Sequence, residues 1–180
     1  MKFFVISQNL TKSDIKLPKH AILRVNLAWH KDLESVLTML SEYPNHDIFL
    51  DIPVGRKKPP NHDHSLDDVE HLVNVSRNIK YVAISNIEDP NNLAVYCRQF
   101  KANIVPKIET LKGAVNLPDI IDELPYALKV IMLDHEDLYS NLVNHRKEKS
   151  YLEIVDKIVR TCKKKNAVLL RAKGIIFTND

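Results

Sequence analysis

Two short strings in the second half of the chain hold residues whose types and spacing could do chemistry together. Val-Pro-Lys-Ile-Glu-Thr spans residues 105–110, His-Glu-Asp-Leu spans 135–138, and each closes an apolar run of strand type. Alternation along a strand puts Lys107 and Glu109 on one face. If Asp137 lies at the matching end of the next parallel strand, one cation and two carboxylates converge there. Such a set could hold a hard divalent cation beside an anionic substrate.

Further charged residues fall on earlier strand-type runs. Arg24 and Asn26 are two apart and share one strand face, and Asp51 closes another run. An inward charge in a barrel is costly unless it is paired or binds a ligand. These residues therefore indicate either an active site at the barrel mouth or a structural cluster of salt bridges, and spacing alone leaves both interpretations open.

Histidines offer weaker signals. His62 and His64 have the HxH spacing of some transition-metal sites, but they lie in a polar loop where solvated histidines are common. His135 could exchange protons or serve as a hydrogen-bonded support. Trp29 and His30 could line a pocket or pack over the barrel end.

The elements that must position these residues alternate along the chain. Strand-type runs occur at Phe3–Ile6, Ala21–Leu27, Ile48–Ile52, Tyr81–Ser85, Asn103–Ile108, Lys129–Leu133 and Ala167–Leu170, with a weak eighth at Gly174–Phe177. One-sided helical stripes lie between them, for example Leu152, Val155, Ile158, Val159 and Cys162. Ser65 with Asp68 predicts a capping box, and Asp89-Pro90 predicts a helix start.

This alternation predicts a parallel sheet with helical crossovers, either a barrel or a doubly wound sheet. The chain has only three glycines and no glycine-rich phosphate loop, which disfavours a dinucleotide fold or a P-loop enzyme. A complete barrel has about 250 residues, whereas this chain has 180. We therefore expect one α/β domain over residues 1–180, a compressed or incomplete (β/α)8 TIM-type barrel.

Composition excludes several classes of protein. There are 26 basic and 23 acidic residues, a net charge of +3, and the basic runs are not interleaved with aromatic residues. We expect no nucleic-acid partner. No apolar segment reaches the ~18 residues of a membrane span, so no membrane partner is expected. Cys97 and Cys162 lack CxxC spacing and fit buried thiols of a cytoplasmic protein.

From residue 21 to about 172, the order of motifs resembles the barrel of pyruvate kinase and its phosphoenolpyruvate/pyruvate superfamily, which includes metal-dependent 2-keto acid aldolases and citrate lyase beta-like lyases. Arg24-Val25-Asn26-Leu27 is similar to the Arg-Leu-Asn-Phe strand of pyruvate kinase. The collinear matches that follow are Phe49-Leu50-Asp51 with Gly55-Arg56, Asp67-Asp68, Tyr81 to Ser85, Asp89, Lys107-Ile108-Glu109 with Gly113 and Asn116, and Met132 to Leu138. The sequence Ile108-Glu109-Thr110 is more similar to the corresponding segment of the aldolases and lyases.

The resemblance implies roles for individual residues. Glu109 and Asp137 would be ligands of Mg²⁺ or Mn²⁺. Lys107 would stabilise or protonate an enolate, and Arg24 would offset its negative charge. From their places on a strand face and at a strand end, we also expect Asn26 and Asp51 to contribute to substrate binding.

The chain also departs from pyruvate kinase. Asp137 lacks the flanking glycines whose backbone amides receive the substrate carboxylate, and residues 51–65 form a loop where pyruvate kinase inserts its lid domain. Phosphoryl transfer from a nucleotide needs a clamp and usually a closing lid. Neither is visible in the sequence.

The hypothesis that fits best is a metal-dependent carbon–carbon lyase or aldolase acting through a pyruvate-like enolate. Its substrate would be a small 2-keto acid or a phosphoenolpyruvate-like compound. Two alternatives remain: a shortened pyruvate kinase-like protein that binds phosphoenolpyruvate or pyruvate without kinase activity, and a non-catalytic barrel that serves as an assembly subunit. Because an incomplete barrel exposes strand edges, we also expect a homo-oligomer.

Overall fold

In the part of the chain that the structure describes, seven strands alternate with helices, as the apolar runs predict. The computed structural model describes residues 5–9, 17–54 and 59–171. The strands are β1 Val5–Ser7, β2 Ile22–Asn26, β3 Ile48–Ile52, β4 Ile79–Ile84, β5 Asn103–Ile108, β6 Val130–Leu133 and β7 Val168–Arg171. The α-helices are α1 Leu33–Glu42, α2 Leu66–Val75, α3 Pro90–Gln99, α4 Leu111–Val115, α5 Leu117–Glu123, α6 His135–Asn144 and α7 Tyr151–Lys164. The short 3-10 helices η2 Leu27–Trp29 and η3 Glu148–Ser150 also lie within the described residues.

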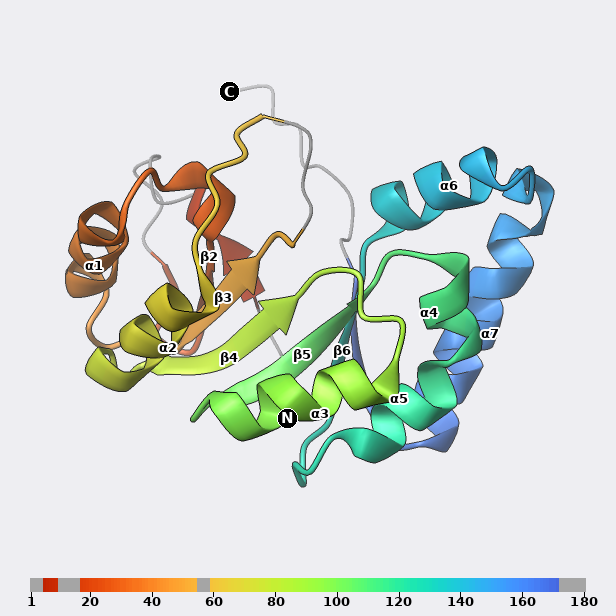
Figure 1. The fold of residues 1–180 in the computed structure, drawn as a ribbon. Coiled ribbons are helices and arrows are strands. Elements are labelled where there is room, and N and C mark those ends of the chain that lie inside the picture. Colours follow the sequence, from red (N-terminus) through yellow and green to blue (C-terminus); the bar gives the residue numbers. More distant parts are fainter. Residues whose placement is uncertain (1–4, 10–16, 55–58, 172–180) are drawn as a thin grey trace.

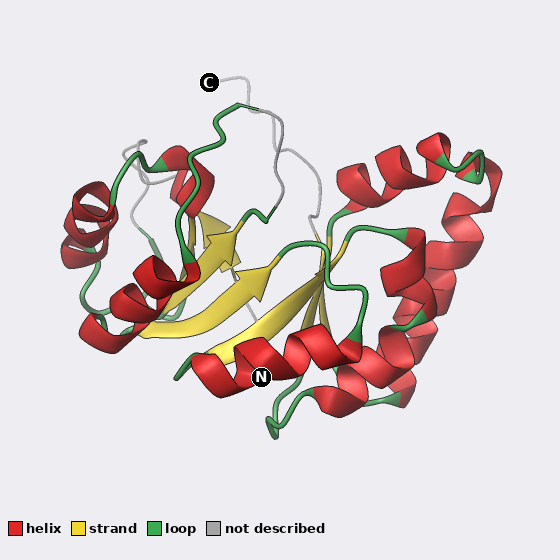
Figure 2. Ribbon diagram, in the orientation of Figure 1, coloured by secondary structure: helices red, strands yellow, loops and turns green. Residues whose placement is uncertain are grey.

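All neighbouring strands are parallel, and their order in the sheet is their order in the chain, β1 to β7. The sheet curls, with helices along its outer side and α6 beyond the ends of the strands (Figures 1 and 2). Within the described residues β1 and β7 are not paired with each other, so the barrel is open there. The expected fold class, a compressed and incomplete TIM-type barrel, is confirmed.

The sheet has two apolar faces of different size. The larger core fills the space between the sheet and the outer helices, and includes Leu23, Leu50, Val82 and Ile104. A smaller cluster lines the inner face, where Phe49 and Tyr81 stack with ring centroids 6.2 Å apart. In β2, β3 and β5 the buried residues of this inner cluster, Ile22, Phe49 and Val105, lie in the first half of the strand, so the later inward positions are left for polar side chains.

Sequence signals for helix starts are confirmed. Ser65 accepts a hydrogen bond from the amide of Asp68, and Asp68 accepts one from the amide of Ser65, which completes the capping box of α2. Asp89 caps α3, which has proline in its first turn. The stripe expected on α7 is only partly buried, because Leu152 at the start of the helix is 77% exposed.

The predicted strand boundaries agree with the structure to within two residues where both can be compared. The proposed eighth strand, Gly174–Phe177, lies outside the described residues, as do Phe3 and Phe4. Among the described residues, no helix combines the length and the apolar composition that crossing a membrane requires.

Candidate active site

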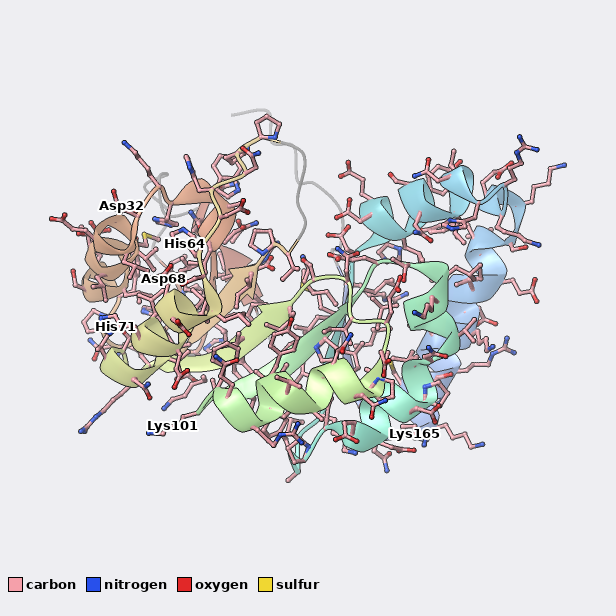
Figure 3. The ribbon with its side chains drawn as sticks, viewed as in Figure 1. Asp32, His64, Asp68, His71, Lys101 and Lys165 are labelled. Carbon is pink, nitrogen blue, oxygen red and sulfur yellow. The ribbon has the colours of Figure 1, made fainter. Side chains whose placement is uncertain are left out.

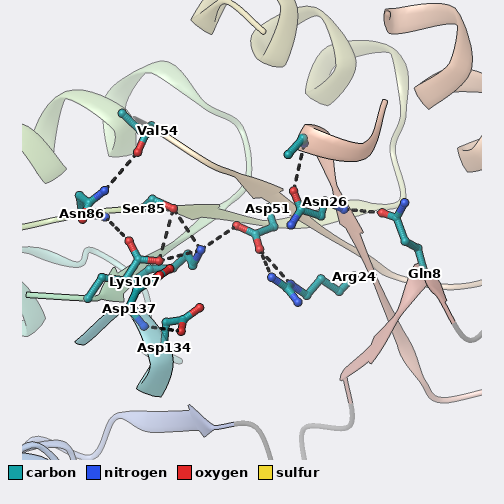
Figure 4. A network of polar contacts seen from close by, with 12 residues as sticks. Gln8, Arg24, Asn26, Asp51, Val54, Ser85, Asn86, Lys107, Asp134 and Asp137 are labelled. Atoms are coloured by element: carbon teal, nitrogen blue, oxygen red, sulfur yellow. Dashed lines mark hydrogen bonds and ion pairs between the residues drawn. The ribbon is translucent and has the colours of Figure 1, made fainter. Parts of the chain in front are cut away.

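Charged side chains gather on the inner face where the strands end. Arg24 and Asn26 of β2, Asp51 of β3 and Lys107 of β5 point to this face, and Glu109 directly follows β5. They alternate with outward residues such as Val25, Leu50 and Ile108, which pack in the larger core. Strand alternation therefore brings Arg24, Asp51, Lys107 and Glu109 into one network (Figure 4).

Asp51 lies between the two cations. Arg24 donates from Nε to Asp51 Oδ2 at 2.9 Å, and its terminal Nη2 also contacts Oδ2. Lys107 Nζ lies 3.3 Å from Oδ1 as an ion pair outside hydrogen-bond geometry. The side chain of Asp51 is fully buried and does not line the cavity described below. Its position suits holding the two cations better than contacting a substrate.

Lys107 is surrounded by oxygen atoms. Its Nζ lies 2.8 Å from Glu109 Oε1 and donates to Ser85 Oγ at 3.0 Å. Burial lowers the pKa of Lys107, but the carboxylates of Asp51 and Glu109 outweigh that effect and hold the pKa above its ordinary value. Lys107 is therefore a fixed cation at neutral pH.

Glu109 is also buried and anchored on both oxygens. Its Oε2 accepts from the backbone amide of Asn86 at 2.8 Å, and Ser85 Oγ lies 3.5 Å from Oε1. Burial raises the pKa of Glu109 above its ordinary value, although Lys107 and the Asn86 amide act in the opposite direction. Asn86 itself has φ 55° and donates from Nδ2 to the carbonyl of Val54 at 3.1 Å.

Three carboxylates form a candidate metal centre. One oxygen each from Glu109, Asp134 and Asp137 lie within 4.8 Å of one another. Asp134 follows β6 directly and caps α6, its Oδ1 accepting from the amides of Glu136 and Asp137 at 3.2 Å each. The sequence placed Asp137 at a strand end. The structure gives that place to Asp134 and puts Asp137 in the first turn of α6, because the strand stops at Leu133.

A cavity of about 290 Å³ opens above these groups. Strand-end residues line one side of it, including Arg24, Lys107 and Glu109. The residues of α6 that line the other side are Asp137, Ser140, Asn141 and Asn144. The two cations and the acidic trio thus face one shared space.

Asn26 reaches the same cavity but has a local role as well. Its Oδ1 accepts from the amide of Ala28 at 3.0 Å, which caps η2, and its own amide donates to Gln8 Oε1. Gln8 Nε2 lies 3.2 Å from His30 Nε2. His30 therefore supports the end of β2 through Gln8.

Contacts within the β5–α4 turn explain why Thr110, Gly113 and Asn116 occupy their positions after Glu109. Thr110 caps α4 by accepting from the amide of Gly113 at 3.1 Å. A Cβ atom at position 113 would lie 2.8 Å from the carbonyl oxygen of Ile87, too close for any larger residue. Asn116 donates to the carbonyl of Glu88 at 2.8 Å. These contacts fix the β5–α4 turn against the end of β4.

The HxH pair lies away from the acidic trio. His64 Nε2 lies 2.8 Å from the carbonyl oxygen of His30, close to Asp32, the N-cap of α1, and to Asp68 in the first turn of α2 (Figure 3). His62 and His64 line a second cavity, of about 370 Å³. In the described part of the chain, histidines join no group of three potential metal ligands.

His135 packs on the start of α7. Its Nδ1 lies 2.6 Å from Tyr151 Oη, and the rings meet edge to face. Burial lowers the pKa of His135, and Arg171 acts in the same direction. This agrees with the supporting role considered from the sequence.

Sequence reasoning missed Asp134, Ser85, Asn86 and Gln8. Asp134 had a usable signal, because it continues the inward alternation of Val130 and Met132. Asn86 and Gln8 had none, since their contacts depend on loops that approach from other parts of the chain.

No protein-family model matches the sequence, and none of the curated proteins does. Solved structures match at the level of the fold. The HpcH/HpaI aldolase/citrate lyase family protein from Burkholderia cenocepacia has a TM-score of 0.61 at 12% identity, covering 82% of this chain and 69% of that protein. Citrate synthase SbnG has a TM-score of 0.61 at 10% identity, covering 95% and 78%.

Pyruvate kinase from Pyrobaculum aerophilum has a TM-score of 0.59 at 14% identity, covering 88% of this chain but 55% of the kinase. The chain thus spans little more than half the length of that enzyme. The fold implied by the order of motifs is confirmed by these structural matches: the chain has a barrel fold similar to those of the aldolase/citrate lyase family protein, citrate synthase SbnG and pyruvate kinase.

Proposed function

We propose that this protein is a divalent-metal-dependent carbon–carbon lyase or aldolase that acts on a small 2-keto acid through an enolate. The observation that carries the proposal is the juxtaposition of the Glu109–Asp134–Asp137 trio with Lys107 and Arg24 around one cavity. Structural likeness to aldolase/citrate lyase family proteins supports this reaction class. Catalytic groups at the carboxyl ends of barrel strands are also usual for this architecture.

The acidic trio fits Mg²⁺ or Mn²⁺. All three ligands are hard carboxylate oxygens, which these ions prefer to nitrogen or sulfur. Asp134 uses Oδ1 for the helix cap, and its other oxygen takes no part in that cap. Bound there, the ion would supply a Lewis acid for the keto oxygen of the substrate.

The chain's own cations would then stabilise negative charge on the substrate. Asp51 and Glu109 keep Lys107 protonated, so it can offset charge on an enolate oxygen or donate a proton to it. Arg24 is held by Asp51 and lines the cavity, where it can pair with the substrate carboxylate. Because both cations are fixed before the substrate arrives, little reorganisation is needed in the reaction.

The backbone amides of Glu136 and Asp137 disfavour the kinase-like alternative. Both are satisfied by the Asp134 side chain, and the amide of Leu138 donates to the Asp134 carbonyl at 3.1 Å. They are therefore occupied where the pyruvate kinase motif would present amides to a carboxylate.

Enolisation is the half-reaction shared by all the lyase options, so it can be tested without knowing the second substrate. We expect the methyl protons of pyruvate to exchange with D₂O faster in the presence of the protein and Mg²⁺ than in the presence of Mg²⁺ alone. NMR measures the exchange rate. Glu109→Gln and Asp137→Asn should abolish the enhancement. Asp156→Asn, at an exposed pair with Arg160 on α7, should not.

Exchange no faster than with Mg²⁺ alone would overturn the enolate mechanism. An enhancement that survives both site substitutions would overturn the assignment of these residues. Metal binding by the wild type that is lost in Glu109→Ala would exclude the purely structural alternative.

A further inference from the structure

A third cavity lies at the amino-terminal ends of β3, β4 and β5, at the opposite end of these strands from the candidate active site. Its volume is about 640 Å³, a size usual for small-molecule sites. Its lining comes from three places: Asp47 before β3, the connection between α2 and β4 with the start of β4, and residues 101–103 at the start of β5. Figure 3 shows Lys101 at this end of the sheet.

An apolar layer separates this cavity from the active site. Asn103 lines the cavity and lies four residues before Lys107 on β5, so both belong to the inner face. Val105 between them, and Ala83 beside Val105 in the sheet register, are fully buried. At about 3.3 Å per residue the two polar positions are about 13 Å apart along the strand. The cavity is therefore a separate site.

Three cationic side chains line this cavity. Arg77 follows the end of α2, Lys80 lies on β4, and Lys101 follows the end of α3. Within the described part of the chain none of the three forms an ion pair. Asp47 is the one carboxylate among the described residues of the lining. Positive charge is therefore in excess around the cavity.

The turn that carries Arg77 is anchored to a neighbouring loop. Asn78 donates from Nδ2 to the carbonyl oxygens of Tyr43 at 3.3 Å and His46 at 3.4 Å. Lys80 Nζ donates to the carbonyl oxygen of Arg77 at 3.0 Å. The backbone of this turn is thus held by contacts within the protein, which reduces the cost of ordering it around a ligand.

Neutral hydrogen-bonding groups accompany the cations. The carboxamides of Asn74 and Asn103 line the cavity, and neither has a hydrogen-bond partner among the described residues. Burial raises the pKa of the Tyr81 phenol above its ordinary value, and Asp47 acts in the same direction. Tyr81 therefore stays protonated at neutral pH and adds no negative charge to the lining.

This combination of groups suits a phosphate. Cations after the carboxyl ends of helices offset the helix dipole, which accounts for Arg77 and Lys101 one by one. It does not account for Lys80, which lies on a strand and lines the same cavity. A phosphate group offers several oxygen atoms to the planar fork of an arginine and to the point charges of lysines. A nucleic acid would instead need a long basic stripe.

We propose that the cavity at the amino-terminal ends of β3, β4 and β5 binds a small anion that carries a phosphate group, held by Arg77, Lys80 and Lys101. The proposal goes beyond the reaction proposed for the other end of the strands and does not depend on it.

Isothermal titration calorimetry on the whole chain at constant ionic strength tests this, with inorganic phosphate, glucose 6-phosphate and glucose as probes. We expect both phosphate compounds to bind and glucose not to bind. Arg77→Gln and Lys101→Gln should each weaken phosphate binding about 10-fold or more, the effect of losing one charge-assisted hydrogen bond. Lys157→Gln, at an exposed position of α7, is the matched control and should leave the affinity unchanged.

Phosphate binding that both cavity variants retain would overturn the proposal, because the anion would then bind elsewhere, for example beside Arg24 and Lys107. No binding of either phosphate compound, or equal affinities for glucose and glucose 6-phosphate, would also overturn it. If binding is lost in both variants, tighter binding of glucose 6-phosphate than of inorganic phosphate would support a site for a phosphorylated organic molecule, and equal affinities would support a site for the phosphate group alone. Circular dichroism checks that the variants are folded.

Discussion

Lys107 reaches Asp51 across an intervening strand. The two residues lie on β5 and β3, and Nζ comes within 3.3 Å of Oδ1 although β4 runs between them. In the sheet register Asp51 lies beside Ala83, and Ala83 lies beside Val105. The small side chain of Ala83 leaves room for the lysine to pass over β4. Three strands are therefore tied together by charge on the inner face as well as by backbone hydrogen bonds.

Asp51→Asn should be strongly destabilising. The substitution removes the buried charge that Arg24 and Lys107 share, and breaking a buried pair from one side costs about 3–5 kcal/mol. Urea unfolding monitored by circular dichroism measures the change. Asp156→Asn, at an exposed pair, should change the free energy of unfolding by less than about 1 kcal/mol. A comparably small loss for Asp51→Asn would show that the network contributes little to stability.

Asp137→Asn should weaken metal binding with little effect on folding. In the metal-free protein the three carboxylates repel one another, so removing one charge relieves that repulsion. We expect Mn²⁺ affinity, measured by electron paramagnetic resonance, to fall more than about 10-fold while the urea midpoint stays within error. Asp119→Asn, an exposed position on α5, should change neither quantity. Unchanged Mn²⁺ affinity in Asp137→Asn would remove this residue from the site.

Pyruvate kinase activity should be absent. The amides around Asp137 are occupied by Asp134, and the chain spans 55% of the kinase it resembles. A coupled assay with ADP, phosphoenolpyruvate, K⁺ and Mg²⁺ is the measurement. Turnover on the order of 10 s⁻¹, an ordinary value for enzymes, would refute the prediction.

The pH dependence of stability should contain a contribution from Cys162. Burial raises the pKa of this thiol to about 11. A folded-state pKa above the unfolded value, about 8.5, means that the contribution is fully present below that value and is lost as the pH rises toward 11. The free energy of unfolding should therefore fall less steeply above about pH 9 in Cys162→Ala than in the wild type. Identical slopes would contradict this.

The protein should form a homo-oligomer. β1 and β7 end the sheet without pairing to each other in the described residues, and the inner-face residues Met132, Val168 and Leu170 are only partly buried. Open edges and apolar surface of this kind favour association with another chain. Light scattering at micromolar concentration should give a mass above that of one chain. A monomeric mass across the concentration range would refute the expectation.

Much of the fold could be predicted because its strands are short, apolar and regularly spaced. Ile48–Ile52 and Asn103–Ile108 have the predicted boundaries. Alternation alone placed Lys107 and Glu109 on one face, and they do form an ion pair. Pro106 would ordinarily disfavour a central strand, because proline lacks the backbone N–H donor. The structure accommodates the proline because the pairing of β5 with β6 begins one residue later, at Lys107.

The details of the site depended on information that local patterns lack. Asp134 and Asp137 lie three residues apart, and only the position at which β6 ends decides which of them follows the strand. The sequence also could not predict that Ser140 and Asn144 line the cavity, because they do so only when α6 lies over the strand ends. Long-range docking, not propensity, determines both.

The residues that line the cavity come from two different parts of the barrel, the strand ends and α6. Arg24 and Lys107 line the cavity from the sheet, whereas Ser140 and Asn144 line it from α6, a helix that contributes Leu138 and Leu142 to the core. Ser140 and Asn144 can therefore be substituted without disturbing the strands beneath, provided that Asp137 and Asn141 are kept. A change at these two positions alters one wall of the cavity while Arg24, Lys107 and Asp137 stay in place.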